Sequence, residues 1–338
     1  MSWAERALTE VLDRVGAVER ELGTRWPLYA DPVSGRWTTT ARGSWTGGFW
    51  AGLLWLRSIV TGDPSDRAAA RRRTGMLAPW LQADTATRGL IFWYGTALGG
   101  DETAALRAEA ARMCLAAHDP RLGLVPWGAA FGGPRYLARV DGLPGLPTLL
   151  RLAGPDGARA AEAHLDLQLG LTLNTPDLRP AWQATPDGTW KPHPTPPPGW
   201  SRTTGWLCLA AAQAPGDRVR RCLEHPAVSA RLAPDAPPVP AAIATSRGTP
   251  DTSAAAIEAV AALQLACRLP GPRAGRLRNR AAHVLAVLAA EHVRDGRLLD
   301  GCYDLEHDVA VRHELVWGDF FMAAGLAMLT GAIDPAAC

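Results

Sequence analysis

The spacing of apolar and polar residues along the chain is that of helices. Apolar residues recur every three or four positions over 3–22, 48–61, 65–82, 102–118, 156–171, 253–268, 273–293 and 317–330. The same spacing indicates shorter helices near 91–98, 143–153, 203–213 and 216–224. No convincing run alternates with the period of two that is typical of strands, and β-branched residues are sparse beside Ala, Leu and Arg. The pattern predicts an all-α protein with roughly a dozen helices.

The predicted helices come in pairs that are separated by glycine- and proline-rich segments. Because pairs continue on both sides of 186–200 and 231–242, we interpret these segments as loops within a single domain spanning 1–338. Helical hairpins in such a number form either a ring or a solenoid. Aromatic residues stand just before several helices, at Trp45, Trp127, Trp200 and Trp317. In a ring these helix ends converge on one central cavity, whereas a solenoid would scatter them.

Composition excludes several classes of protein. Of the 338 residues 47% are apolar and 20% are charged, and the net charge of +2 comes from interspersed acids and bases. No basic stripe indicates nucleic acid, and no uncharged run approaches the roughly 20 residues that span a bilayer. The six cysteines are scattered without a Cys-x-x-Cys pair, and the first residues lack the pattern of a signal peptide. These features predict a soluble, cytoplasmic protein, and they leave its oligomeric state open.

The stretch "SWTGGFW" (44–50) combines bulky rings with bare backbone at the start of a predicted helix. Its glycines allow a ligand or a neighbouring chain to approach the backbone closely. Trp45 and Phe49 are therefore candidates for platforms that line a pocket, although ordinary core packing is an equal alternative for Trp45. For Trp50 and Trp55, further along the helix, we favour the core.

Asp141 precedes a turn that leads into a leucine-rich helix. Two interpretations remain open from this segment alone. The first is an N-cap that is satisfied locally, and the second is a carboxyl group at the mouth of a cavity, able to donate a proton.

Two further segments carry candidate chemistry. Arg202 stands between Trp200 and Trp206 at a helix start, and a guanidinium that stacks on rings suits an anionic sugar, although a surface salt bridge is the alternative. The acid- and histidine-rich stretch 301–329 has no compact metal-ligand spacing, so we expect no metal, and Asp319 is interpreted as a brace of the last helix. No phosphate-cradling loop or nucleotide fingerprint occurs, so we expect no cofactor.

Five segments, taken in chain order, resemble glycoside hydrolase family 88, the unsaturated glucuronyl hydrolases. The opening "SWTGGFWAGLLWL" resembles the family's Trp-Thr-x-Gly-Phe-Trp-x-Gly-x-Leu-Trp. The others are "VDGLPGLPTLLRLAG", "GWSRTTGWLCLAAA", "DTSAAAIEAVAAL", and "GCY" followed by "VWGDFF". The resemblance extends over about 40–330.

This resemblance implies an (α/α)6 barrel of six helical hairpins with its site at the helix ends. It also implies a hydration-driven reaction on the Δ4,5-unsaturated uronic acid that polysaccharide lyases leave. An aspartic acid protonates the vinyl ether at C4, and the same group then deprotonates the water that adds at C5. By motif position Asp141 resembles that residue. Residues that match substrate-contacting positions are Trp45, Phe49, Trp127, Trp200, Arg202 and Trp206.

The chain also departs from the family pattern. The family has a second aspartate in a His-Asp-Leu-Gly-Phe segment, and our alignment places Arg88 there, with Asp84 as the nearest acid. Arg88 is therefore a candidate partner of a substrate carboxylate or sulfate. In the proline-rich segment only His193 is kept as a candidate contact, and "VRHEL" stands where the family has an acidic Val-Asp-Glu-Ser.

Three functions remain open from the sequence. The first is a hydrolase of unsaturated uronides with an altered subsite, acting on an anionic saccharide. The second is an enzyme of natural-product metabolism that uses Asp141 to protonate or hydrate another enol ether or alkene. The third is a non-catalytic sugar-binding descendant. We favour an active enzyme because Asp141 and its aromatic surroundings are kept together.

Overall fold

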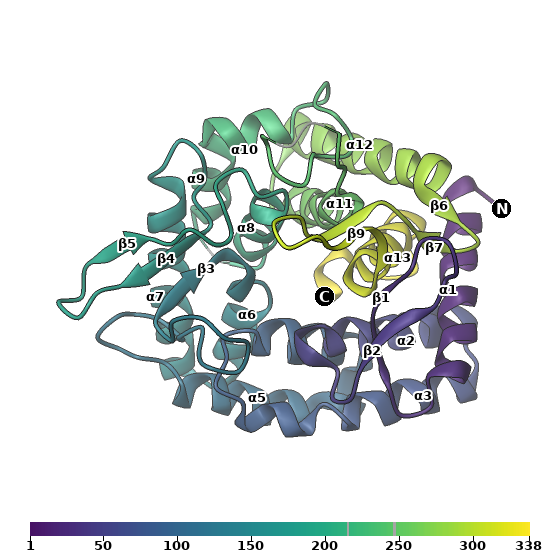
Figure 1. Cartoon of the computed structure of the whole chain (residues 1–338), viewed down its shortest axis with the longest axis horizontal. Coiled ribbons are helices and arrows are strands. Elements are labelled where there is room, and N and C mark those ends of the chain that lie inside the picture. The colour runs from purple at the N-terminus through teal and green to yellow at the C-terminus, as the bar shows by residue number, and fades with distance from the viewer. Residues whose placement is uncertain (215, 246–247) are drawn as a thin grey trace.

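The computed structural model describes residues 1–214, 216–245 and 248–338, and helices in two layers dominate it (Figure 1). The inner helices are α2 (Gly47–Thr61), the π-helical turn η3 (Gly89–Trp93) with α4 (Tyr94–Thr96), α6 (Leu146–Leu152), α8 (Arg202–Ala212), α11 (Thr252–Cys267) and α13 (Val316–Thr330). The outer helices are α1 (Trp3–Leu22), α3 (Pro64–Gly75), α5 (Ala104–Ala116), α7 (Pro155–Leu173), α9 (Arg218–Glu224) with α10 (Pro226–Arg231), and α12 (Gly271–Val287).

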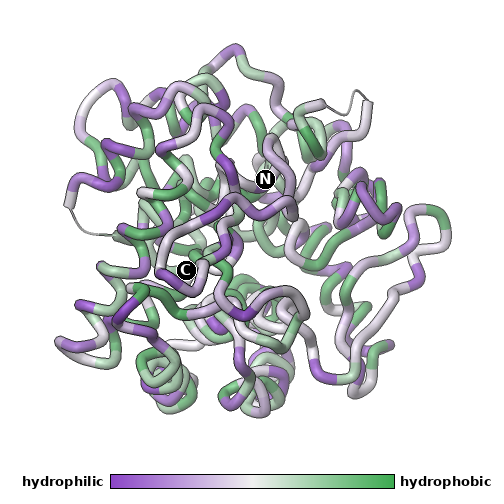
Figure 2. The backbone as a smooth tube through the Cα atoms, turned by 60° about the vertical axis from the view of Figure 1, so that its left-hand side comes forward, coloured by the Kyte–Doolittle hydropathy of each residue, from purple (hydrophilic) through white to green (hydrophobic). Residues whose placement is uncertain are grey.

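The apolar pattern of each helix decides its layer. All residues of α8 and most of α11 and α13 are buried, as expected for helices that are apolar on every side. In α1 the buried positions recur every three or four residues, so only one face meets the core. Figure 2 shows hydrophilic and hydrophobic positions interleaved along the backbone.

The helix pairs follow one another around a ring that closes on itself. Each inner helix packs against the outer helix that follows it, and the last inner helix, α13, packs against α1 at the other end of the chain. In Figure 1, α11 and α13 lie inside while α1, α3, α5 and α12 lie at the periphery. This closure confirms the ring and excludes the solenoid.

A few short strands occur that the sequence pattern did not predict, although helices dominate the fold as expected. One antiparallel sheet has the order β2 (Trp37–Thr40), β1 (Trp26–Ala30), β9 (Val309–Leu315) and β8 (Gly301–Asp304). A second consists of β3 (Leu137–Arg139), β4 (Ala181–Ala184) and β5 (Trp190–Pro192), and a third of β6 (Val293–Arg294) and β7 (Arg297–Leu298). The strands are at most seven residues long, and several pair across long sequence separations, so little period-two signal exists to detect.

Some predicted helix ends also move. The predicted helix 65–82 divides into α3 and a separate 3-10 turn (Ala78–Gln82), and 273–293 divides into α12 and a π-helical turn (Leu288–His292). The short helix α10, which begins at Pro226, was not predicted because six residues give too little periodicity. Among the described residues, no helix combines the length and the apolar character that a membrane crossing requires.

Candidate active site

One cavity of about 460 Å³ opens at the ends of the inner helices. Its wall comes from segments at or just before the starts of those helices, together with the turn between β8 and β9. The aromatic lining residues are Trp45, Trp127, Phe131, Trp200, Trp206 and Tyr303. The charged lining residues within the described part of the chain are Arg139, Asp141, Arg202, Asp304 and Glu306. Rings and charges therefore meet in one hollow, where three of the four tryptophans predicted to converge, Trp45, Trp127 and Trp200, are found.

Asp141 lies on this wall, in a 3-10 turn (Val140–Gly142) that follows β3. The N-cap position of α6 belongs to Gly145, and the hydrogen bonds of the Asp141 carboxylate come from a side chain, so the interpretation of Asp141 as a cap is wrong. Arg139 donates from Nε to Oδ1 at 3.0 Å and from Nη2 to Oδ2 at 2.7 Å. The Asp141 side chain keeps 16% of its surface exposed. The Arg139 guanidinium therefore holds the Asp141 carboxylate in a bidentate contact on the cavity wall.

Trp127 supports this ion pair from one side. The guanidinium carbon of Arg139 lies 4.2 Å from the centre of the Trp127 ring, and Trp127 Nε1 donates to the carbonyl of Gly132 at 3.1 Å. A guanidinium over an indole face gains a cation–π interaction. The ring thus fixes the plane in which Arg139 meets Asp141.

Arg202 forms a second, more deeply buried cluster. It lies over Trp200 at 4.5 Å, and its Nη1 donates to Oδ2 of Asp251 at 3.0 Å. Its Nη2 donates to the carbonyl of Tyr303 at 2.8 Å, and Nη1 also donates to the carbonyl of Cys302. Only 4% of Arg202 is exposed. The alternative of a surface salt bridge is therefore wrong, and Arg202 is a fixed part of the wall.

Asp251 holds this cluster together from behind the cavity. Its carboxylate accepts hydrogen bonds from the Ser201 hydroxyl at 2.6 Å and from the Cys302 main-chain N–H at 3.2 Å. It is also the N-cap of α11, accepting from the N–H of Ser253 at 3.1 Å. Asp251 begins the segment "DTSAAAIEAVAAL", but no role was predicted for it. An aspartate directly before a helix was the available signal.

Trp45 belongs to the cavity rather than to the core alone. Its Nε1 donates to the Tyr303 hydroxyl at 3.3 Å, and its ring centre lies 4.9 Å from that of Trp317. Trp206 also reaches the cavity, although only 1% of it is exposed. Trp317, the second residue of α13, is fully buried against Trp45 and does not line the cavity.

Phe49 does not lie where the resemblance implied. It is fully buried among other rings, with its centre 5.1 Å from Tyr94 and 5.4 Å from Phe320, and it is absent from the lining residues. As part of α2, it points into the core between helices. The expectation that Phe49 contacts substrate is therefore wrong, and Phe49 is a residue of the core.

Arg88 also does not line the cavity, whereas its neighbour Thr87 does. The Arg88 guanidinium donates to the carbonyls of Thr85, at 3.4 Å, and Ala83, and burial lowers its pKa. Neighbouring residues of a helical turn point about 100° apart, so an alignment offset of one residue moves a side chain to a different face.

The remaining candidate contact, His193, lies beside the cavity. Its Nδ1 is within 2.8 Å of the Thr195 carbonyl oxygen, and the lining residues of this loop are Thr195, Pro196 and Pro197. His193 therefore orders the loop that forms the wall.

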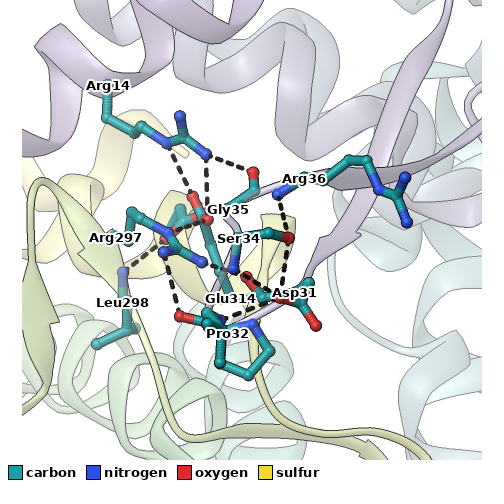
Figure 3. Close-up of polar contacts among 11 residues, drawn as sticks. Arg14, Asp31, Pro32, Ser34, Gly35, Arg36, Arg297, Leu298 and Glu314 are labelled. Carbon is teal, nitrogen blue, oxygen red and sulfur yellow. Dashed lines mark hydrogen bonds and ion pairs between the residues drawn. The ribbon is translucent and has the colours of Figure 1, made fainter.

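Neither Asp84 nor Glu314 joins the site. Asp84 accepts from Arg135 Nε at 3.0 Å at the protein surface. Glu314 is buried in β9 and accepts from Arg297 at 2.8 Å and from Arg14 at 3.4 Å (Figure 3).

Cys302 lines the cavity, but burial raises the pKa of its thiol to about 12, so it is not a nucleophile at neutral pH. Among the described residues, no three His, Cys, Asp or Glu side chains gather as a metal site would require.

Comparison with known proteins gives a match in structure but not in sequence. No family model matches the chain, and no curated protein matches it. The unsaturated glucuronyl hydrolase of Bacillus sp. GL1 has a TM-score of 0.87 over 97% of both chains, at 21% identity. The unsaturated glucuronyl hydrolase of Streptococcus agalactiae has a TM-score of 0.83 over 97% of this chain and 92% of that one, at 17% identity. The chain therefore has the (α/α)6 barrel fold of the unsaturated glucuronyl hydrolases.

Proposed function

We propose that the protein hydrolyses saccharides that carry a Δ4,5-unsaturated uronic acid at the non-reducing end, with Asp141 as proton donor and then base. One observation carries the proposal: Asp141 stands on the wall of an aromatic cavity at the helix ends of this fold. The structures that share the fold support it, because one of them holds dGlcA-Glc-Rha-Glc and another holds dGlcA-GalNAc6S.

The reaction needs one carboxyl group in two protonation states. As a carboxylic acid, Asp141 gives its proton to C4 of the vinyl ether, and the positive charge at C5 is shared with the ring oxygen. As a carboxylate, it takes a proton from the water that adds at C5. The hemiketal so formed opens, the glycosidic bond breaks, and the aglycone leaves with a proton. One water is consumed, and Asp141 ends as it began.

The other wall residues bind and orient the sugar. The faces of Trp127 and Trp200 are each backed by a guanidinium, so both rings are held in place as apolar platforms for a sugar ring. The two lining arginines favour an anionic substrate. The six free cysteines suit a reducing compartment, which supports a cytoplasmic location. A nucleic acid or a membrane has no part in this proposal.

The test follows the ultraviolet absorbance of the unsaturated uronide in lyase-generated disaccharides. The wild-type protein should remove this absorbance, and Asp141→Asn should lower kcat/KM by about 10³-fold, because the amide can neither give nor take the proton. Asp84→Asn, a surface change in a neighbouring segment, should keep wild-type activity. The proposal fails if the wild-type protein leaves the absorbance unchanged with every such disaccharide, or if Asp141→Asn matches it while both remain folded by circular dichroism.

One observation favours a second candidate function. Thr87 lines the cavity. If the glycine of the family's segment corresponds to Gly89, Thr87 stands in place of the second aspartate. A wall without that second aspartate suits protonation or hydration of another enol ether or alkene. Turnover of a carboxylate-free enol ether that depends on Asp141, without turnover of the uronides, would select this candidate.

A further inference from the structure

The two lining arginines differ in how free they are to meet a ligand. Arg202 donates to Asp251 and to two main-chain carbonyls, and 4% of it is exposed. All side-chain hydrogen bonds of Arg139 within the described part of the chain go to Asp141. The Arg139 side chain keeps 19% of its surface exposed. Arg139 is therefore the lining cation whose partner can be exchanged without disturbing the backbone.

The contact between Arg139 and Asp141 conflicts with proton donation. Both carboxylate oxygens of Asp141 accept an N–H from Arg139, at 3.0 and 2.7 Å, and this bidentate contact matches a carboxylate better than a carboxylic acid. Giving up one of these contacts would free a carboxylate oxygen to carry the proton. Separating the pair leaves a partly buried guanidinium without an anion, which is unfavourable unless another anion replaces Asp141.

A substrate carboxylate is the anion that fits this place. The planar fork of a guanidinium matches a carboxylate in a bidentate contact, and Trp127 holds the plane of Arg139 at the cavity wall. We propose that Arg139 exchanges Asp141 for the carboxylate of the bound uronate, so that recognition of the acid frees Asp141 to take a proton from solvent. Arg139 is thus a specificity-determining residue, and the inference rests on the proposed function.

The exchange predicts that Asp141 competes with ligand carboxylates, which a binding experiment measures without turnover. The probes are the 4,5-saturated methyl glucuronoside, which has no double bond to hydrate, and its methyl ester. By calorimetry at pH 7, Asp141→Asn should bind the acid about tenfold more tightly than the wild-type protein, because Arg139 no longer has a competing anion. The affinity for the ester should not change. Arg139→Gln should bind the acid about tenfold more weakly and the ester equally.

Two further variants separate recognition from a structural role. Arg139→Lys keeps the charge but not the fork, so its affinity for the acid should lie between those of the wild-type protein and Arg139→Gln. Arg135→Gln changes an exposed arginine of the same segment that pairs with Asp84, and it should bind both probes as the wild-type protein does.

Several outcomes would overturn the exchange. It is overturned if Asp141→Asn leaves the affinity for the acid unchanged or weakens it, if Arg139→Gln alters the affinities for acid and ester alike, or if neither probe binds any form of the protein. The binding experiment and the test of the proposed function can fail independently of each other. Wild-type protein that binds the acid in the expected pattern but leaves uronide absorbance unchanged contradicts the hydrolase and retains the role of Arg139.

Discussion

Single residues behind the cavity wall hold its tryptophans in place. His164, in α7, is fully buried, and its Nδ1 accepts a hydrogen bond from the main-chain N–H of Val125 at 3.1 Å. Val125 stands two residues before Trp127, which carries the Arg139 guanidinium on its face. Burial lowers the pKa of His164 to about 3. The neutral imidazole is therefore the form that anchors this part of the wall.

Acid should destabilise the protein through His164. Because its folded-state pKa of about 3 lies below the ordinary value of 6.5, the unfolded chain binds one more proton between these pH values. The contribution to stability is complete above pH 6.5 and is lost as the pH falls towards 3. Between pH 7 and pH 5 the free energy of unfolding should decrease by about 2 kcal/mol more in the wild-type protein than in His164→Asn, whose amide oxygen can accept from Val125.

Urea unfolding at both pH values measures this difference. His283→Asn, a change at an exposed position of α12, should retain the wild-type dependence on pH. An equal pH dependence in His164→Asn and the wild-type protein would mean that another group causes the loss of stability in acid.

The sequence predicted residues of the site only where a motif carried them. Asp141, Trp45 and Trp200 each stand in a segment with a recognisable pattern, and the structure places all three on the cavity wall. Arg139 gave no such signal, because an arginine two residues before an aspartate is common and its contact depends on the turn after β3. Phe49 was misassigned because spacing cannot tell which side of an inner helix faces the cavity.

At the scale of elements, the glycines of the opening motif let two inner segments touch. Gly48 in α2 packs against the π-helical turn η3 so closely that a Cβ there would overlap the carbonyl oxygens of Leu90 and Ile91. Leu90 lines the cavity, as does Thr87, two residues before η3. The bare backbone beside the rings therefore serves helix packing, and that packing sets the position of one side of the cavity.

Gly48→Ala should reduce the free energy of unfolding by roughly 3 kcal/mol, because the methyl group meets main-chain atoms that cannot rotate away. Gly275→Ala is the matched control in the interior of outer helix α12, where no described heavy atom beyond the helix itself lies within 4 Å of the added Cβ. It should stabilise the protein by about 0.5–1 kcal/mol, since alanine is the better helix former. Chemical denaturation of both variants measures this contrast, and a similar small effect in both would show that α2 and η3 separate easily.

The helices were predictable as elements, whereas the strands were not. The first predicted helix, 3–22, coincides with α1 because its apolar spacing is long and regular. The pairing of β1 with β9 places Tyr29 opposite Leu315, and no local pattern reports a contact across such a separation. These loop sheets therefore become visible only in the structure.

At the scale of the whole molecule, the ring depends on a contact between the two ends of the chain. Glu314 in β9 is fully buried and accepts from Arg14 in α1 and from Arg297 in β7 (Figure 3). Arg297 also donates to the carbonyl of Asp31 at 2.6 Å, and Arg14 donates to that of Gly35 at 3.1 Å. One carboxylate thereby joins the first helix, the loop after β1 and the last strand. The tryptophan positions predicted a ring, but the residues that close it lie about 300 positions apart and share no motif.

Glu314→Gln should weaken this contact between the two ends of the chain, so that α1 and α13 open together more often. The neutral amide leaves two guanidinium groups without their buried anion, so the free energy of unfolding should decrease by about 3 kcal/mol. Burial and Glu314 both raise the pKa of Asp319, whose Oδ1 accepts from the Leu298 N–H at 3.2 Å, so the loss of the Glu314 charge relieves part of the penalty. Glu291→Gln, at an exposed position beyond α12, should change stability by less than about 0.5 kcal/mol. Hydrogen exchange of the backbone amides then shows whether Glu314 stabilises α1 and α13 together or only its own strand, β9. If the ring is closed by Glu314, amides of α1 and α13 lose protection by the same factor in Glu314→Gln, whereas a loss confined to β9 would show that the closure depends on apolar packing between the two helices.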